Sequence, residues 1–95
     1  MKTKAKIMIV DDAEMNREIL MVILGDEYEY VQAENGRQAI HILQQDMNID
    51  LMLLDINMPE MNGFQVLDRM NTFHWINDIP VIMISSEEKK DVIER

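Results

Sequence analysis

Acidic side chains follow two apolar runs of this chain, and their chemistry suits metal binding or attack on phosphorus. The run Ile7–Val10 is followed by Asp11 and Asp12, and the run Leu51–Leu54 is followed by Asp55. Apolar runs without polar alternation are typical of strands that are covered on both faces of a parallel sheet. If these two strands are neighbours, their three carboxylates meet in the crevice at the carboxyl ends, where open α/β sheets bind ligands.

Three negative charges in one crevice repel one another unless a cation neutralises them. A site made only of oxygen ligands suits Mg²⁺, which proteins commonly hold by one or two carboxylates together with phosphate oxygens and water. A carboxylate beside such a metal can act as a nucleophile toward phosphorus and form an aspartyl phosphate. A further apolar run, Val81–Ile84, ends at Ser85, whose hydroxyl could donate to a phosphoryl oxygen.

The first helix is expected immediately after the Asp11-Asp12 pair. Its apolar positions Met15, Ile19, Val22 and Ile23 have the spacing of one helical face, which predicts an amphipathic helix. Gly25 is its expected carboxyl-terminal cap, because glycine tolerates the backbone conformation that commonly ends a helix.

The rest of the chain continues this alternation of strands and helices. Asn35 and Asn62 are each followed three residues later by glutamine, a pattern that marks the start of a helix. Such alternation argues for an α/β fold, a doubly wound parallel sheet with helices on both faces. The remaining expected elements are a weaker strand at 30–33, a helix from 36 to about 47, a helix with Val66, Leu67 and Met70 on one face, and a last helix that starts near Glu87 and Glu88.

Composition limits the classes of function. Ninety-five residues make one small domain, 1–95. The net charge of −9, without a basic patch, argues against direct binding of nucleic acid or of an anionic membrane surface. The chain has no cysteine, which fits a cytoplasmic location, and its amino terminus does not read as an export signal.

Three segments together resemble the receiver domains of two-component response regulators, of the chemotaxis-receiver type. They are 9–12 (Ile-Val-Asp-Asp), 55–63 (Asp-Ile-Asn-Met-Pro-Glu-Met-Asn-Gly) and 80–85 (Pro-Val-Ile-Met-Ile-Ser), and the likeness extends over nearly all of the chain. The resemblance implies a flavodoxin-like fold with strand order 2-1-3-4. It also implies a phosphorylation-dependent signalling switch of a two-component phosphorelay, with self-phosphorylation and self-dephosphorylation chemistry but no enzymatic turnover.

The resemblance assigns a role to each candidate residue. Asp55 becomes the phospho-acceptor, fed by a histidine kinase or a phosphotransfer protein. Mg²⁺ would be held by the carboxylates of Asp12 and Asp55 and by the backbone carbonyl of Asn57, while Asp11 would act through water. Ser85 becomes the switch hydroxyl. The output domain or partner protein that reads the switch is not indicated.

The chain departs from the family pattern after residue 85. Receivers continue into a fifth strand, a lysine that follows it and a final helix, and none of these can be identified here. We therefore expect a receiver domain that is incomplete at its carboxyl terminus. Its last strand would be an open sheet edge, and such an edge invites pairing with another chain, including a homodimer.

Two other functions compete with the phosphorylation switch. One is an interaction module that keeps the receiver fold but works without phosphorylation, because the lysine is missing. The other is a phosphohydrolase of the haloacid-dehalogenase type, which also begins with an aspartate at a strand end. That class needs a second carboxylate two positions after the nucleophile, where this chain has Asn57.

Overall fold

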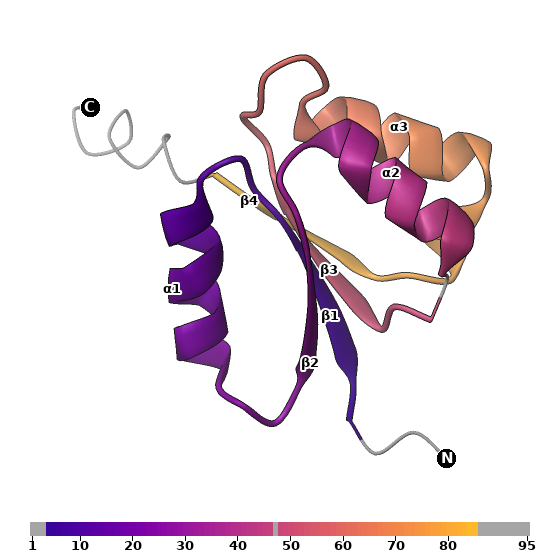
Figure 1. The fold of residues 1–95 in the computed structure, drawn as a ribbon. Coiled ribbons are helices and arrows are strands. Elements are labelled where there is room, and N and C mark those ends of the chain that lie inside the picture. The colour runs from indigo at the N-terminus through magenta and orange to yellow at the C-terminus, as the bar shows by residue number, and fades with distance from the viewer. Residues whose placement is uncertain (1–3, 47, 86–95) are drawn as a thin grey trace.

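The computed structural model describes residues 4–46 and 48–85, which form a four-stranded parallel sheet with helices on both faces (Figure 1). Helix α1 covers one face, and α2 and α3 cover the other. In chain order the elements are β1 (Lys6–Val10), α1 (Glu14–Leu24), β2 (Glu29–Ala33), α2 (Gly36–Gln45), β3 (Leu51–Asp55), α3 (Gly63–Thr72), the short 3-10 helix η1 (Trp75–Asn77) and β4 (Val81–Ile84).

The strand order β2-β1-β3-β4 confirms the order predicted from the sequence. All three neighbouring pairs are parallel, so every strand ends at the same edge of the sheet. In the register, Val10 lies beside Ala33 on one side and Leu54 on the other, and Asp55 lies beside Ile84. The residues that follow β1 and β3 therefore emerge next to each other.

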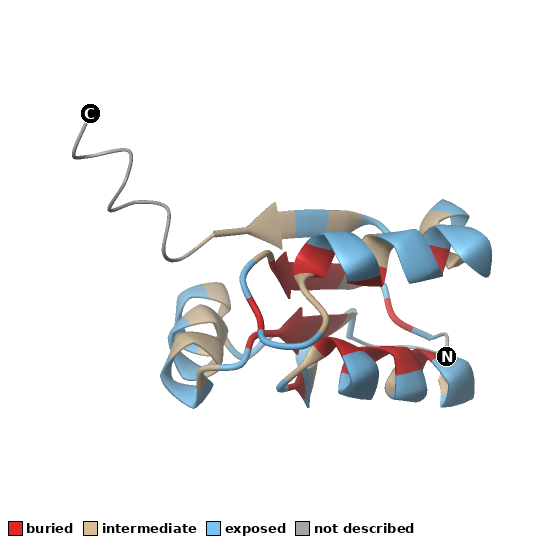
Figure 2. Ribbon diagram, turned by 90° about the horizontal axis from the view of Figure 1, so that it is seen from above, coloured by how far each residue is buried: buried red, intermediate tan, exposed pale blue. Residues whose placement is uncertain are grey.

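The two faces of the sheet are covered unequally. On the α2 and α3 face, thirteen buried residues form one cluster, with Met8, Met52, Leu54 and Met70 fully enclosed. On the α1 face the buried cluster contains only Ile7, Ile9 and Leu53. Figure 2 shows the same contrast, because buried residues lie along β1 and β3 and on the inner sides of α2 and α3 but not on α1.

The sequence periodicity predicted the wrong side of α1 as the side that packs on the sheet. The helix and its cap at Gly25 are confirmed, with a φ of 94° at the glycine and its N–H bonded to Met21 O. The side chains that pack on the sheet, however, are Leu20, Met21 and Leu24. Because residues 19–24 are all apolar, the sequence fits several helix faces equally well, and the predicted face points outward.

The starts of α2 and α3 agree with the sequence. The Asn35 side chain accepts a hydrogen bond from Gln38 N at 2.7 Å, and Asn62 accepts one from Gln65 N at 2.9 Å. Gln65 also accepts from Asn62 N, which completes a reciprocal cap. A cap of this kind stabilises a helix by about 1 kcal/mol, and here it fixes where the loop after Asp55 ends.

Strand β4 forms the edge of the sheet within the described residues, and its Ile82 is 52% exposed. The sequence did not predict η1, and the expected last helix near Glu87 lies outside the described residues. No helix within residues 4–46 and 48–85 has the length and apolar character needed to cross a bilayer.

Candidate metal and phosphorylation site

The sheet brings together the three aspartates selected from the sequence. Val10 and Leu54 are register partners, so Asp11, which directly follows β1, stands beside Asp55 at the end of β3. One carboxylate oxygen each of Asp11, Asp12 and Asp55 lies within 4.8 Å of the other two. Asp11 and Asp55 are buried, each 3% exposed, whereas Asp12 is exposed. The cluster is therefore enclosed at Asp11 and Asp55 and open to solvent at Asp12.

Hydrogen bonds orient the two buried carboxylates. Ala13 N donates to Asp11 Oδ1 at 2.9 Å, and Asn16 Nδ2 lies 3.5 Å from the same oxygen. Asn57 N donates to Asp55 Oδ1 at 3.3 Å. These donors come from the loops that leave β1 and β3 and from the first turn of α1, so the backbone after each strand folds back onto its own aspartate.

Arg17 is a basic side chain beside this cluster, and it bonds to oxygens other than those of the aspartate carboxylates. Its Nη1 donates to the backbone carbonyl of Asp11 at 2.6 Å, and its Nε donates to Gln32 Oε1 at 2.9 Å. Within the described residues the lysines are Lys4 and Lys6, at the start of β1 and far from its carboxyl end. In this part of the chain no lysine ammonium offsets the charge of the three aspartates.

The environment of Asp11 raises the pKa of its carboxyl group. Burial is the main cause, because it disfavours the charged form, and the negative charge of Asp12 acts in the same direction. The hydrogen bonds from Ala13 and Asn16 oppose both effects without cancelling them. A cation that neutralises the cluster would offset much of this electrostatic cost of the charged carboxylate.

Ser85 lies where the sequence predicted it, directly after β4. Ser85 directly follows Ile84, which is the register partner of Asp55. Its Oγ is enclosed and has no hydrogen-bond partner among the described residues. Ser85 and Asp11 both line a hollow of about 330 Å³ between α1 and β4. A donor hydroxyl with no partner among the described residues therefore lies at the same edge of the sheet as the carboxylates.

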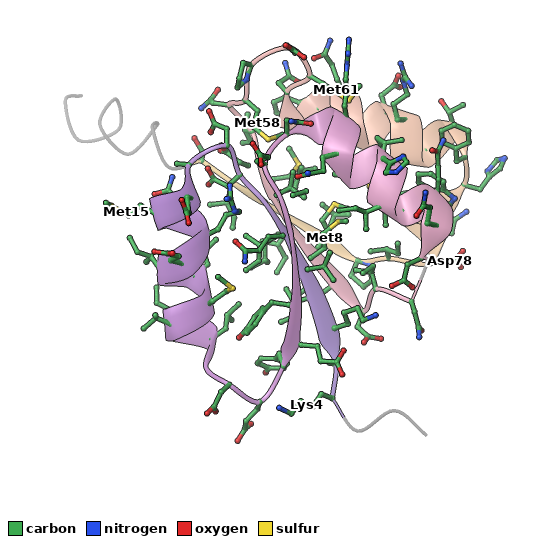
Figure 3. The ribbon with its side chains drawn as sticks, viewed as in Figure 1. Lys4, Met8, Met15, Met58, Met61 and Asp78 are labelled. Carbon is green, nitrogen blue, oxygen red and sulfur yellow. The ribbon has the colours of Figure 1, made fainter. Side chains whose placement is uncertain are left out.

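Met58 in the loop after β3 and Gly63 at the start of α3 were not selected from the sequence as site residues. Met58 is buried, 8% exposed, and joins the main core cluster, which anchors the loop (Figure 3). Gly63 N donates to Ile56 O at 2.9 Å, and a Cβ added at Gly63 would lie 2.5 Å from the backbone oxygen of Asp55. In the sequence, the Asn62-Gly63 pair was the single indication that the start of α3 comes close to the end of β3. Asn57, the third proposed ligand residue, is exposed in the same loop.

The donor set fits a magnesium ion. It contains only oxygen ligands, combines buried and exposed carboxylates, and leaves an open side for water or a phosphoryl group. It does not resemble a thiolate or imidazole site, since the chain has no cysteine and His41 and His74 lie in α2 and at the start of η1.

Comparison with known proteins decides the family. The family model of the response regulator receiver domain matches residues 7–95. The chain belongs to this family. The two-component response regulator ORR3 of rice is 31% identical to this receiver domain over 90 residues, which cover 94% of this chain and 69% of the relative. Response regulator RR06 of Streptococcus pneumoniae is 41% identical over 81 residues, but the receiver domain spans only 36% of that protein.

Solved structures agree with the receiver fold. The chemotaxis protein CheY4 of Vibrio cholerae is 32% identical, with a TM-score of 0.76 over 93% of this chain and 76% of that one. Response regulator TrrA of Thermotoga maritima, solved in complex with Mg²⁺ and BeF, is 33% identical, with a TM-score of 0.76 over 92% of this chain and 76% of that one. The flavodoxin-like receiver fold expected from the sequence is thus confirmed.

Replacing Asp11 with asparagine should raise the melting temperature at neutral pH without metal. Because the folded-state pKa of Asp11 is raised above 3.8, the folded state binds the proton more tightly than the unfolded state. The free energy of unfolding therefore falls as the pH rises from 3.8 through the folded-state pKa. Asparagine at position 11 keeps an oxygen acceptor for Ala13 N. Because the amide does not titrate, the loss of stability with rising pH that comes from Asp11 is absent. Thermal melts from acid to neutral pH measure both effects, and a lower melting temperature for Asp11→Asn would contradict the expectation.

Adding Mg²⁺ should raise the melting temperature of the wild-type chain. An ion that binds only the folded state stabilises it by about 2.7 kcal/mol at a hundred times its dissociation constant. Asp12→Asn combined with Asp55→Asn should remove this increment, whereas Asp26→Asn, in the exposed turn before β2, should keep it. An equal Mg²⁺ increment in the double variant would place the ion elsewhere.

Proposed function

We propose that this receiver domain is a phosphorylation switch that accepts a phosphoryl group on Asp55. The observation that carries the proposal is the meeting of three carboxylates within 4.8 Å at the ends of β1 and β3, in a chain of the receiver family. Asp55 is the member of this cluster that terminates a central strand and is followed by an anchored loop. Its carboxylate is therefore held in place for attack.

The transfer involves one nucleophile, one metal ion and one donor hydroxyl. A carboxylate oxygen of Asp55 attacks the phosphorus of a phosphohistidine or acyl phosphate in line, and the bond from phosphorus to the donor breaks as the new phosphorus–oxygen bond forms. Bound Mg²⁺ supplies positive charge for the phosphoryl oxygens. Ser85 Oγ, enclosed and without a partner in the described part of the chain, donates to one of those oxygens after transfer.

We assign the metal to Asp12 and Asp55 as direct ligands, with the backbone carbonyl of Asn57 as a third ligand and Asp11 acting through water. The exposure of Asp12 supports a direct role, because a ligand at the rim exchanges water easily. Asp11 is enclosed and already accepts bonds from Ala13 and Asn16, which suits a supporting role. The Mg²⁺ and BeF complex of TrrA is consistent with this assignment.

The partner that supplies the phosphoryl group is inferred to be a histidine kinase or phosphotransfer protein of the cytoplasm. The hydrolase alternative has no support left, because the chain belongs to the receiver family and Asn57 stands where a second carboxylate is needed. A phosphorylation-independent interaction module remains the second candidate. The observation that favours it is the absence of a lysine from the acidic cluster within the described residues.

Phosphorylation by acetyl phosphate tests the proposal. We expect intact-protein mass spectrometry to show one phosphoryl adduct when Mg²⁺ is present and none when it is chelated. Circular dichroism of the same samples establishes that the chain is folded. An unchanged mass in a folded sample with Mg²⁺ would reject the switch and favour the interaction module.

A homodimer through the open edge at β4 remains a prediction. Within the described residues no strand pairs with the outer side of β4, and Ile82 is half exposed there. An unpaired edge with an apolar side chain favours association with another copy. Light scattering should then give a mass that rises with protein concentration, and Ile82→Lys should lower it. A monomer mass at all concentrations would reject the dimer.

A further inference from the structure

Helices α2 and α3 lie side by side on one face of the sheet, and the surface between them is hollowed (Figure 1). Two hollows of about 320 and 330 Å³ lie there, and both are lined by Arg37, Met61 and Arg69. We call the two hollows together the α2–α3 groove. All of its lining residues come from α2, from α3 and from the loop that precedes α3.

The two hollows of the groove differ in charge. The smaller one is lined by Glu60 and Asp68 in addition to the two arginines, so its charges balance. The larger one is lined by the same arginines together with Ile40, His41 and Gln44, and no carboxylate of the described residues lines it. On a chain with a net charge of −9, the larger hollow is therefore a local site for a negative group.

The two arginines of the groove are the least engaged basic side chains of the described residues. Each of the other three donates a hydrogen bond to an oxygen; they are Lys4, Lys6 and Arg17. Arg37 lies 4.0 Å from Glu60, and both side chains are exposed, so this ion pair contributes little free energy. The Arg69 guanidinium makes no hydrogen bond or ion pair within the described part of the chain. Both guanidinium groups are thus open to an external acceptor.

Apolar side chains line the larger hollow beside the arginines. Ile40 is buried, 7% exposed, and Met61 is partly buried against the same core cluster. A guanidinium group binds a carboxylate through two parallel N–H bonds, which fixes the position of the acid. A free inorganic anion would use the arginines alone. An occupant that joins a carboxylate to an apolar group uses the whole lining, and an acidic stretch of polypeptide has this chemistry.

We propose that the α2–α3 groove binds an acidic segment of a partner protein. A glutamate or aspartate of that segment pairs with Arg37 and Arg69, and a neighbouring apolar side chain packs on Ile40 and Met61. Glu60, which lines the other hollow, repels further carboxylates and so favours one orientation of the segment. The groove is separate from the acidic cluster at the strand ends, and its binding does not depend on phosphorylation of that cluster.

Titration with a designed peptide tests the proposal. The probe is a capped peptide of about eight residues, about 26 Å when extended, built from glutamate and leucine. In two comparison peptides glutamine or lysine replaces every glutamate. On isotope-labelled protein we expect amide shifts concentrated in residues 37–44 and 60–69. Affinity for each comparison peptide should be at least about tenfold weaker.

Variants of the arginines measure their contribution. Arg37→Gln with Arg69→Gln should weaken binding of the glutamate peptide about tenfold and flatten its salt dependence. Arg69→Lys keeps the charge but loses the planar pair of donors, so it should weaken binding less than Arg69→Gln does. Glu60→Gln should strengthen binding, because it releases Arg37 and removes a like charge from the groove.

A matched control separates the groove from the net charge of the protein. Lys4→Gln changes the net charge by as much as Arg69→Gln, at an exposed position before β1, and should bind as the wild type does. All of these variants replace exposed side chains, so folding is expected to survive and is checked by circular dichroism.

Six results would each overturn the proposal. Three concern the peptides and the arginines: equal affinity for the glutamine peptide, amide shifts outside α2, α3 and the loop between β3 and α3, and unchanged affinity of the double arginine variant. A loss in Lys4→Gln equal to that in Arg69→Gln would reduce the effect to net charge. Inorganic phosphate that shifts the same amides and binds as tightly as the peptide would assign the groove to a free anion. Concentration-dependent shifts of these amides in the free protein would assign it to a second copy.

Discussion

Replacing Asp55 with asparagine should reduce phosphorylation by acetyl phosphate below detection. The amide has nearly the shape of the carboxylate but lacks the negative oxygen that attacks phosphorus. Asn57 N can still donate to the side-chain oxygen at position 55, so the loop keeps its hydrogen bond. The measurement is intact-protein mass spectrometry in the presence of Mg²⁺, followed by peptide mapping of the wild-type adduct.

Two control variants make that result specific. Asp26→Asn removes a carboxylate that is exposed at the opposite end of the sheet and should leave the adduct unchanged. Asp12→Asn retains the nucleophile but loses a metal ligand, so phosphorylation should become slower without disappearing. If Asp55→Asn still carries the adduct, the acceptor is another residue and the assignment of Asp55 is wrong.

Replacing Gly63 with alanine should destabilise the domain by about 3 kcal/mol. The new methyl group would lie 2.5 Å from the backbone oxygen of Asp55 and 2.9 Å from Ile56 Cα. Backbone atoms cannot move aside as a side chain does, so either α3 or the end of β3 must shift. Domains of this size are stable by about 5 to 15 kcal/mol, so a large part of the stability would be lost. Urea unfolding measures the change.

Gly36→Ala is the matched comparison for Gly63→Ala. Its added Cβ would meet Val66 Cγ2 at 2.8 Å and Met61 Cγ at 2.9 Å, which are side-chain and not backbone atoms, and the unbranched Met61 side chain can rotate away. We expect a smaller loss of stability than at Gly63. Equal losses would show that the approach of α3 to Asp55 is no tighter in practice than an ordinary side-chain contact.

The site was predictable from the sequence because it depends on strand ends. Parallel strands end at one edge, so the apolar runs before Asp11 and Asp55 place both carboxylates together once the two strands are taken as neighbours. Ser85 followed from the same rule. The spatial order of the strands came from the family resemblance, because periodicity alone does not say which strands are neighbours.

Other features could not be obtained from the sequence for physical reasons. Residues 19–24 are uniformly apolar, so the side of α1 that meets the sheet depends on tertiary packing and not on periodicity. The closeness of Gly63 to Asp55 depends on the path of a nine-residue segment, 55–63, that returns to its own start. A lone glycine in a sequence does not reveal such a path.

The unequal cores on the two faces of the sheet have a consequence for how the protein opens. With no buried residue of its own, α1 can detach while the cluster under α2 and α3 stays intact, so its local unfolding requires less free energy than global unfolding. Asp11 is held to the sheet, because its N–H donates to Ala33 O of β2 at 3.1 Å, whereas Asp12 lies in the connection between Asp11 and α1. Each detachment would move Asp12 away from Asp55, so an ion bound by these two carboxylates would be thermodynamically linked to the docking of α1.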